Sequence, residues 1–143
     1  MRTSSNIIDL LRKHEGVSRY VYEDHLGNAT IGVGRCIQLN IGLGLSDDEI
    51  DYLLNNDIGR CVNELSHAFP WFMGLNIARK DALISMCFNL GMTRLRGFKR
   101  ALDAMSRHDF EEAAEEFMDS LWSKQVGIRA FELSEMIRAG DYI

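Results

Sequence analysis

Glu15, Asp24 and Thr30, near the N-terminus, have the types and spacing that could cleave a glycosidic bond. Glu15 precedes Gly16, a residue type that commonly ends helices, so its carboxyl is expected in a last helical turn. There the negative end of the helix dipole disfavours ionisation, and burial beside the helix would act in the same direction. A carboxyl that stays protonated can act as a general acid.

Asp24 is expected on a polar turn, where its carboxyl should remain ionised. Hydrolysis of a glycosidic bond requires two carboxyls in different environments, and the Thr30 hydroxyl could hold a water beside them. The same residues also fit ordinary surface acids, because the chain contains 21 Asp and Glu residues. Glu23, adjacent to Asp24, is an equally good candidate by spacing. The residue types alone leave these alternatives open.

A first helix is expected to carry Glu15. The apolar residues within 7–11 share one helical face, and Ser4 or Ser5 can act as the N-cap. Gly16 is the predicted stop, which places Glu15 at the C-terminal end of the helix.

A hairpin is expected to carry Asp24 and Thr30. Residues 20–22 favour a strand, residues 25–28 supply turn chemistry, and residues 29–33 read as a returning strand. This small sheet ends before Ser46, which forms a capping box with Glu49 and so begins a second helix.

The rest of the chain is expected to be helical. Apolar residues recur at helical spacing from Ile50 to Leu65, so the second helix is long and is expected to bridge two lobes. After a break at Pro70, Asn76 caps a helix that is apolar on nearly every side and ends at Gly91. Three further helices are expected at 93–107, 109–121 and 126–139, with Thr93, Asp109 and Gly140 as caps.

Composition excludes several classes of protein. At 143 residues the chain can form one core, and its formal charge of -5 argues against nucleic acid, which binds clustered Lys and Arg. No apolar run approaches the ~20 residues of a membrane span. Charge at Asp9 and Arg12 interrupts any signal-peptide core, so synthesis in the cytoplasm is expected.

The remaining chemistry-bearing side chains have simpler interpretations. Cys36, Cys61 and Cys87 lie far apart and are interpreted as buried, reduced thiols. The four histidines show no helical pairing, so no metal or other cofactor is predicted. Trp122 is interpreted as a packing residue, with a sugar platform as the alternative.

A longer motif resembles the signature of phage-type lysozymes, the family 24 glycoside hydrolases. The motif reads Glu15-Gly16, then Tyr22-x-Asp24-x-x-Gly27-x-x-Thr30-Ile31-Gly32-x-Gly34. Further segments resemble the same family in the same order: 46–57, 79–98 and Trp122-x-x-Gln125 with Arg129. The chain is thereby identified as similar to the lysozymes of T-even-type phages.

The resemblance implies a role for each matching residue. Glu15 would protonate the leaving glycosidic oxygen, Asp24 would position or activate a water, and Thr30 would help to hold that water. Arg129 would lie near Glu15, orient it and oppose its neutralisation. Family members of this kind invert the anomeric centre. The implied substrate-binding positions are Gly34, Phe88 and Asn89.

Some positions depart from the family's pattern. Arg35 and Cys36 stand where a histidine and an apolar residue are usual, and Ala101 and Glu116 replace small hydroxyl and amide residues. The proline that commonly follows the Trp-x-x-Gln element is absent. These changes concern the cleft, and the three catalytic positions match the pattern.

The resemblance implies an α+β, mainly helical, two-lobed lysozyme-like fold that makes one domain of residues 1–143. Residues 14–60 would form the small β-containing lobe and the inter-lobe helix, and residues 1–13 would pack with 61–143 in the helical lobe. The implied enzyme is a muramidase that cleaves β-1,4 bonds between N-acetylmuramic acid and N-acetylglucosamine in peptidoglycan.

The resemblance also implies a setting for that activity. The enzyme would be a monomer made in the host cytoplasm that reaches the periplasmic cell wall through a separate holin-type pore and lyses the host cell. The alternatives are a catalytically silent peptidoglycan- or sugar-binding module on the same fold and an enzyme that degrades chitin or chitosan.

Overall fold

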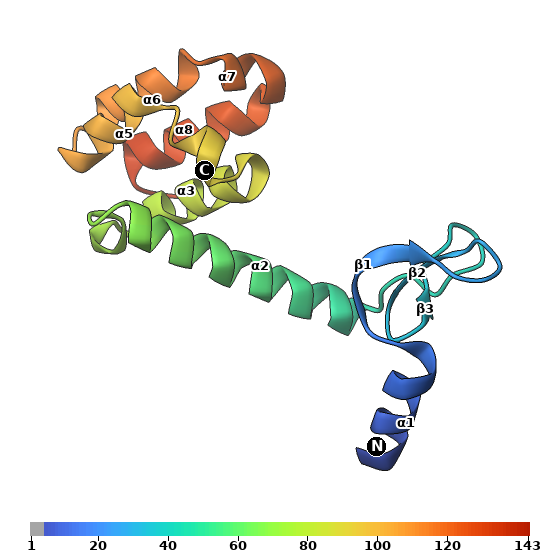
Figure 1. Ribbon diagram of the computed structural model, residues 1–143. Helices are drawn as coiled ribbons and strands as arrows, with labels where there is room; N and C mark the ends of the chain where they lie inside the picture. The colour runs from blue at the N-terminus through green and yellow to red at the C-terminus, as the bar shows by residue number, and fades with distance from the viewer. Residues whose placement is uncertain (1–4) are drawn as a thin grey trace. The chain divides into compact units, whose positions relative to one another are not determined.

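The computed structural model describes residues 5–143, apart from the side chain of Leu121, and combines helices with one small antiparallel sheet (Figure 1). The predicted α+β, mainly helical class is therefore confirmed. The chain divides into two compact units, with the boundary between Asp51 and Tyr52. We call them the N-terminal unit and the helical unit. The predicted lobes, 14–60 and 1–13 with 61–143, stay a prediction.

The first helix, α1 (Ser5–Glu15), ends where the sequence predicts. Gly16 follows with φ of 76°, and its amide donates to the Arg12 carbonyl at 2.9 Å. Of the two predicted caps, Ser5 is the first residue of the helix and Ser4 lies outside the described residues. The apolar side chains of α1 are 39–45% exposed. The expected amphipathic helix is present, and Glu15 is its last residue.

A sheet of three strands, β1 (Ser18–Glu23), β2 (Ala29–Gly32) and β3 (Arg35–Cys36), follows in the order β1-β2-β3. The predicted hairpin is β1 with β2, and the short third strand was not indicated by the sequence. On the central strand, Thr30 pairs with Tyr22 on one side and Cys36 on the other. Thr30 is consequently only 3% exposed.

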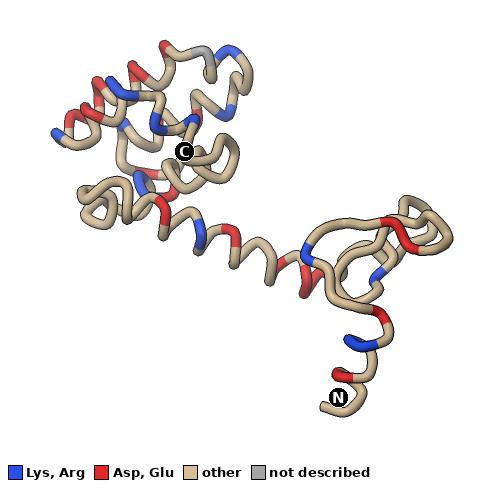
Figure 2. Tube along the Cα trace, viewed as in Figure 1, with Lys and Arg blue, Asp and Glu red and all other residues tan. Residues whose placement is uncertain are grey.

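The long helix α2 (Asp47–Ala68) begins at the predicted capping box. The Glu49 amide donates to Ser46 Oγ at 3.3 Å, and the Ser46 amide donates to Glu49 Oε1 at 2.8 Å. Acidic residues fill the first turn of the helix (Figure 2), where they interact favourably with the positive end of the helix dipole.

The helical unit contains the other elements. A 3-10 turn, η1 (Phe72–Gly74), follows the predicted break at Pro70. Asn76 caps α3 (Ile77–Leu90) as predicted, by accepting the Arg79 amide at 3.0 Å. Gly91 ends α3, and Gly140 ends the last helix, α8 (Ile128–Ala139), with φ of 71°. The elements after α2 are η1 (Phe72–Gly74), α3 (Ile77–Leu90), α4 (Met92–Leu95), α5 (Lys99–Ser106), α6 (Phe110–Met118), α7 (Leu121–Val126) and α8 (Ile128–Ala139).

All three helices predicted after α3 are wrong in their bounds. The helix expected over 93–107 is broken between α4 and α5, and Gly91 rather than Thr93 precedes α4. The Phe98 ring lies 5.6 Å from Phe117 and 6.1 Å from Trp122, so core packing fixes the break. The helix expected over 109–121 ends at Met118, although its cap, Asp109, is confirmed. The third begins at Ile128 rather than Val126, which ends α7.

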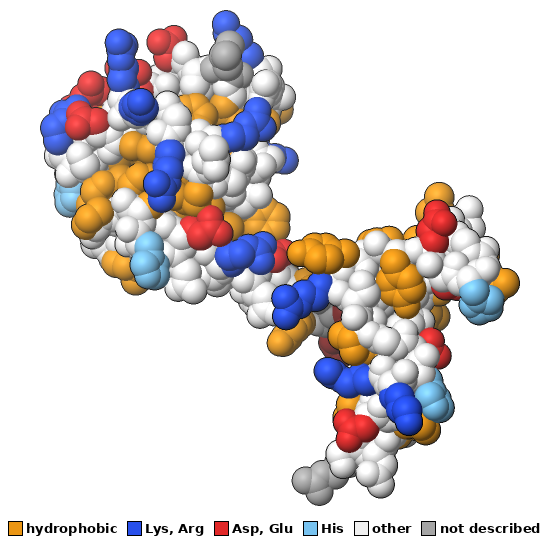
Figure 3. Space-filling model, in the orientation of Figure 1, with side chains coloured by type: hydrophobic (Ala, Val, Ile, Leu, Met, Phe, Trp, Pro, Cys, Tyr) orange, Lys and Arg blue, Asp and Glu red, His pale blue; other side chains and the backbone are white. Residues whose placement is uncertain are grey.

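The hydrophobic core lies in the helical unit. Its fully buried side chains come from α2, η1 and the later helices and include Leu65, Phe72, Leu83 and Phe117. Trp122 is 3% exposed and joins this core, which favours packing over a sugar platform. Apolar side chains also appear on the surface of the N-terminal unit (Figure 3), where Tyr20 and Leu43 are 80% and 82% exposed. The helical unit therefore has a buried apolar core, whereas the N-terminal unit exposes many of its apolar side chains.

Candidate active site

The Glu15 carboxylate lies directly over the turn between β2 and β3. A Cβ atom built on Gly34 would come within 2.7 Å of Glu15 Oε2 and 3.0 Å of its carboxyl carbon. Because an added side chain would displace the Glu15 carboxylate, Gly34 is the residue that lets this carboxylate approach the backbone. Glu15 itself is exposed, so the burial considered in the sequence analysis is not seen in this unit.

Asp24 is fixed by a tight polar turn between β1 and β2. Its Oδ1 atom accepts the amides of Leu26 at 2.9 Å and Asn28 at 2.8 Å. The Asp24 amide in turn donates to the Asn28 carbonyl at 3.0 Å, and the Gly27 amide donates to the Asp24 carbonyl at 2.9 Å. Both side-chain bonds use Oδ1, so Oδ2 accepts no hydrogen bond from the residues that the structure describes.

These backbone amides set the charge of Asp24. The hydrogen bond from the Asn28 amide is the largest effect and lowers the pKa of the Asp24 carboxyl, partly opposed by desolvation. The Leu26 amide and the nearby His25 ring lower it further. Amides that donate to a carboxylate stabilise its ionised form. The expectation that Asp24 is ionised on a polar turn therefore agrees with its surroundings.

Asn28 links Asp24 to Thr30. Its amide bonds the Asp24 carboxylate, while its carbonyl accepts the Thr30 hydroxyl at 2.9 Å. This leaves the lone pairs of the Thr30 oxygen as acceptors for a further donor. The sequence analysis missed Asn28 because its contribution comes from backbone atoms. The turn signal over residues 25–28 was the only hint.

Glu23 and Asp24, which spacing could not separate, occupy different environments. Glu23 is the last residue of β1, lies opposite Ala29 in the sheet register and is exposed. Asp24 is half-buried and held by two amides. A carboxylate with a fixed position suits a role at one reacting atom better than an exposed side chain on a strand end.

Arg35, which departs from the family's pattern, anchors the sheet to the start of α2. Its guanidinium donates to Glu49 Oε1 at 2.5 Å and to the Gly44 carbonyl at 3.2 Å. The Ser46 amide and Arg35 together lower the pKa of Glu49 to about 2. Arg35 follows Gly34 directly in the chain, so this ion pair also braces the turn beneath Glu15.

The other predicted site residues belong to the helical unit. Phe88 and Asn89 are exposed near the end of α3, and Arg129 is exposed in the first turn of α8. Phe88 is 51% exposed and lines a hollow of about 350 Å³ with Leu54 and Ile84. The pairing of Arg129 with Glu15 stays a prediction.

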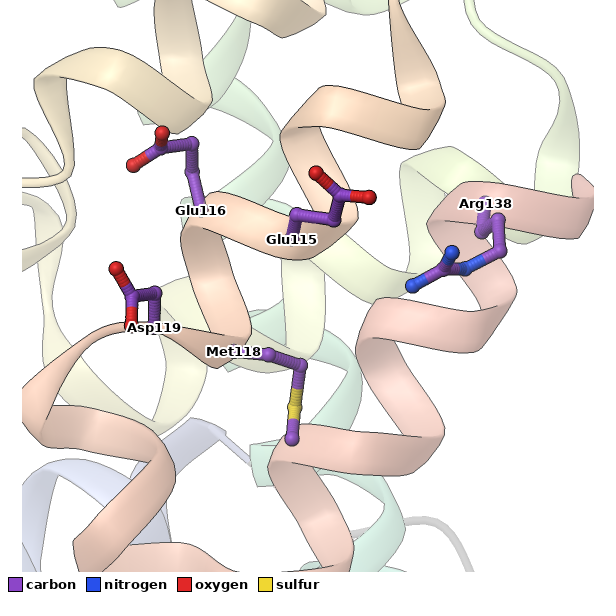
Figure 4. A pocket seen from close by; sticks show the side chains of 5 residues that line it. All are labelled: Glu115, Glu116, Met118, Asp119 and Arg138. Carbon is purple, nitrogen blue, oxygen red and sulfur yellow. The ribbon is translucent and has the colours of Figure 1, made fainter.

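A separate hollow of about 460 Å³ gathers acidic side chains on α6 (Figure 4). Glu115, Glu116 and Asp119 line it, with Arg138 projecting from α8. Arg138 is held there by ion pairs with Glu111 and Glu135. No cluster of His, Cys, Asp and Glu in residues 5–143 is arranged to hold a metal ion. This hollow contains none of the predicted catalytic residues.

Comparison with known proteins places this chain in a family. Residues 12–138 match the family described as phage lysozyme. The chain is 30% identical over 129 residues to the endolysin of Salmonella phage P22, covering 87% of this chain and 85% of that one. It is 25% identical over 162 residues to a T4-type lysozyme of Dictyostelium discoideum, covering 95% of each chain.

A third relative is much longer. The chain is 28% identical over 161 residues to the pre-baseplate central spike protein of Enterobacteria phage T4, and this covers 95% of the chain but 28% of the spike protein.

None of the helices in the part of the chain that the structure describes is long and apolar enough to cross a membrane. Because the family match extends over most of the chain, this protein belongs to the phage lysozyme family of glycoside hydrolases.

Proposed function

We propose that this lysozyme-family enzyme hydrolyses the β-1,4 bond between N-acetylmuramic acid and N-acetylglucosamine in bacterial peptidoglycan. The observation that carries the proposal is the hydrogen-bonded network of Asp24, Asn28 and Thr30, in the same unit as a helix end that holds Glu15 over Gly34. Glu15 and Asp24 are thus two carboxyls with different surroundings, as glycoside hydrolysis requires.

Glu15 acts as the general acid. In its protonated form it gives its proton to the glycosidic oxygen, so that the bond to the sugar carbon breaks and the leaving sugar departs as an alcohol. The contact with Gly34 limits the positions that the carboxyl can adopt. Arg129 orients Glu15 and opposes its neutralisation once the proton has been transferred.

Asp24 activates the attacking water. Its Oδ2 atom takes a proton from the water while the water oxygen bonds to the sugar carbon, and its negative charge favours the positive charge that develops there. Thr30 helps to hold the water through the free lone pairs of its hydroxyl. Attack opposite the leaving group inverts the anomeric centre, so the new reducing end is first formed as the α anomer.

The helical unit contributes to substrate binding. Phe88 offers an exposed aromatic face on which a sugar ring can pack, and Asn89 offers an amide for hydrogen bonds. Gly34 contacts the sugar through its backbone beside Glu15. The enzyme acts as a monomer, is made in the host cytoplasm, and reaches the periplasmic wall through a holin-type pore to lyse the host cell.

Release of reducing ends from purified peptidoglycan tests the assignment. Glu15→Gln keeps the size and the exposed position of the side chain but removes the acid proton. We expect its rate to fall on the order of 10²–10⁴-fold, the usual contribution of a general acid. Circular dichroism should show an unchanged fold. A folded Glu15→Gln variant with the parent's rate would refute the proposal.

Two further measurements separate the finer claims. Proton NMR of the first product should show the α anomer, and a product that kept the β configuration would refute inversion. Chitin oligomers compared with peptidoglycan distinguish a chitin-degrading relative. Binding of the parent to peptidoglycan without any release of reducing ends would instead favour the silent binding module.

A further inference from the structure

Cys61 and Cys87 belong to the buried cluster of the helical unit. Cys61 lies on α2 and Cys87 lies on α3, 26 positions later in the chain. Both line the same pocket of about 290 Å³, and the Cys61 side chain lies close enough to Cys87 to help raise the pKa of its thiol. A disulfide between them requires the two sulfurs to approach to about 2.05 Å.

The pocket gives a small oxidant access to these sulfurs. The two cysteines are 6% and 4% exposed, but the charged side chains of Asp57, Arg60 and Glu64 also line the pocket and reach solvent. The third cysteine, Cys36, belongs to the other unit, where it pairs with Thr30 on the sheet. The geometry therefore singles out one pair of sulfurs.

We infer that Cys61 and Cys87 form a site of reversible covalent modification, in which thiol–disulfide exchange with a small-molecule disulfide links α2 to α3. The proposed function bears only on where this oxidation would occur. Peptidoglycan lies outside the reducing cytoplasm, in a compartment in which disulfides persist. The pair itself is free in the described structure.

The order of the two steps follows from the surroundings of Cys87. Burial, and then the nearby Cys61 side chain, raises the pKa of the Cys87 thiol to about 12, so Cys87 remains protonated at neutral pH. The first attack is therefore assigned to Cys61, because Cys87 is held in its less reactive thiol form.

The chemistry balances with one molecule of oxidant. The Cys61 thiolate attacks the disulfide RSSR, forms a mixed disulfide and releases RS⁻, which takes the Cys87 proton. The Cys87 sulfur then displaces the second RS⁻ from Cys61, and this thiolate is protonated from solvent. Two protein thiols are oxidised, and one RSSR is reduced to two RSH.

The cross-link should stabilise the helical unit. It closes a loop between residues 61 and 87, which restricts the unfolded chain more than the folded one. From the usual size of this effect, we expect the melting temperature to rise by about 4–10 °C on oxidation. Lysozyme activity of the reduced protein is independent of this outcome.

The test uses the full chain carrying Cys36→Ala, which leaves a single possible intramolecular pair. The protein is incubated with oxidised glutathione, unfolded and alkylated with iodoacetamide. We expect its mass to fall by about 2 Da with no alkylation, and a non-reducing tryptic digest to contain the Cys61–Cys87 peptide pair. Dithiothreitol should reverse the change and the rise in melting temperature.

Matched variants make the outcome decisive. Cys61→Ser and Cys87→Ser, each made in the Cys36→Ala chain, should show no oxidation-dependent rise in melting temperature. The inference would be overturned if both thiols were still alkylated after oxidation. It would equally be overturned if the chain with all three cysteines instead formed a disulfide through Cys36. The same holds if only glutathione adducts were found. Reducing-end release, measured under reducing conditions, tests the proposed function separately.

Discussion

The two units of this enzyme achieve order in opposite ways. Among residues 5–51, Thr30 is the one buried side chain, and the unit is held by strand pairing, tight turns and the Arg35–Glu49 ion pair. The helical unit instead contains a continuous apolar core of fully buried side chains such as Leu65, Met86 and Phe117. One unit is ordered by hydrogen bonds and the other by packing.

This difference bears on where chemistry can be placed. Glu15, Asp24 and Thr30 all lie in the hydrogen-bonded unit, where backbone amides and carbonyls can be aimed at a carboxylate. Turns that fix polar groups supply little buried apolar area, so this unit can contribute only modestly to stability. We therefore expect substitutions in the two units to affect stability and activity separately.

Phe117→Ala should give the largest loss of stability. Phe117 is fully buried and packs against Phe98 and Trp122, at ring distances of 5.6 and 6.3 Å. Truncating a buried phenylalanine typically costs about 3–5 kcal/mol. Urea unfolding followed by circular dichroism measures this loss.

Val21→Ala on β1 is the matched control for that prediction. Val21 is 57% exposed, so its truncation should change the unfolding free energy by less than about 0.5 kcal/mol. Equal losses for both variants would break the contrast between the two units.

Gly34→Ala should reduce activity with little effect on the helical core. Gly34 has φ of 71°, and an added Cβ would lie 2.7 Å from Glu15 Oε2, so the carboxylate must move. Misplacing a catalytic group by about 1 Å can cost on the order of 10²-fold in rate. Reducing-end release measures this loss.

Gly44→Ala controls for backbone strain alone. Gly44 has φ of 61°, but an added Cβ meets no atom within 4 Å. Its activity should therefore exceed that of Gly34→Ala by at least about tenfold, since only Gly34 contacts Glu15. Equal activities would mean that strain, rather than the contact with Glu15, explains the loss.

Glu49→Gln should give the smallest effect, visible only in acid. The pKa of Glu49 is lowered from its ordinary value of 4.5 to about 2, mainly by the Ser46 amide and the Arg35 guanidinium. A carboxyl whose pKa falls on folding stabilises the fold above the unfolded pKa, and this contribution is lost as the pH falls towards the folded pKa.

The N-terminal unit of the parent should therefore lose stability as the pH falls from about 4.5 to about 2, and Glu49→Gln should lose less over the same window. Urea titrations followed by NMR signals of residues in the sheet can measure both slopes. Parallel slopes would show that this ion pair does not contribute to the acid sensitivity.

Local signals explain which parts of the fold could be predicted. The capping box of Ser46 and Glu49 and the cap at Asn76 are made by neighbouring residues, and both are present as predicted. The turn that holds Asp24 was also indicated by its residue types. In each case the relevant partners lie within four residues of one another.

The features that were missed depend on distant residues or on backbone atoms. The helix expected over 93–107 is interrupted because Phe98 packs against Phe117 and Trp122, which are far away in the sequence. Asn28 acts through its amide and carbonyl, so its side chain gave no signal. The contact of Glu15 with Gly34 likewise requires the sheet to be folded.

The central claim is that the turn-held carboxylate, and not its neighbour on the strand, activates the attacking water. Asp24→Asn and Glu23→Gln test it side by side, because the two residues are adjacent and each change removes one charge. We predict that Asp24→Asn lowers reducing-end release from purified peptidoglycan on the order of 10²–10⁴-fold, while Glu23→Gln stays within about twofold of the parent. Full activity in folded Asp24→Asn, or an equal loss in Glu23→Gln, would contradict the account.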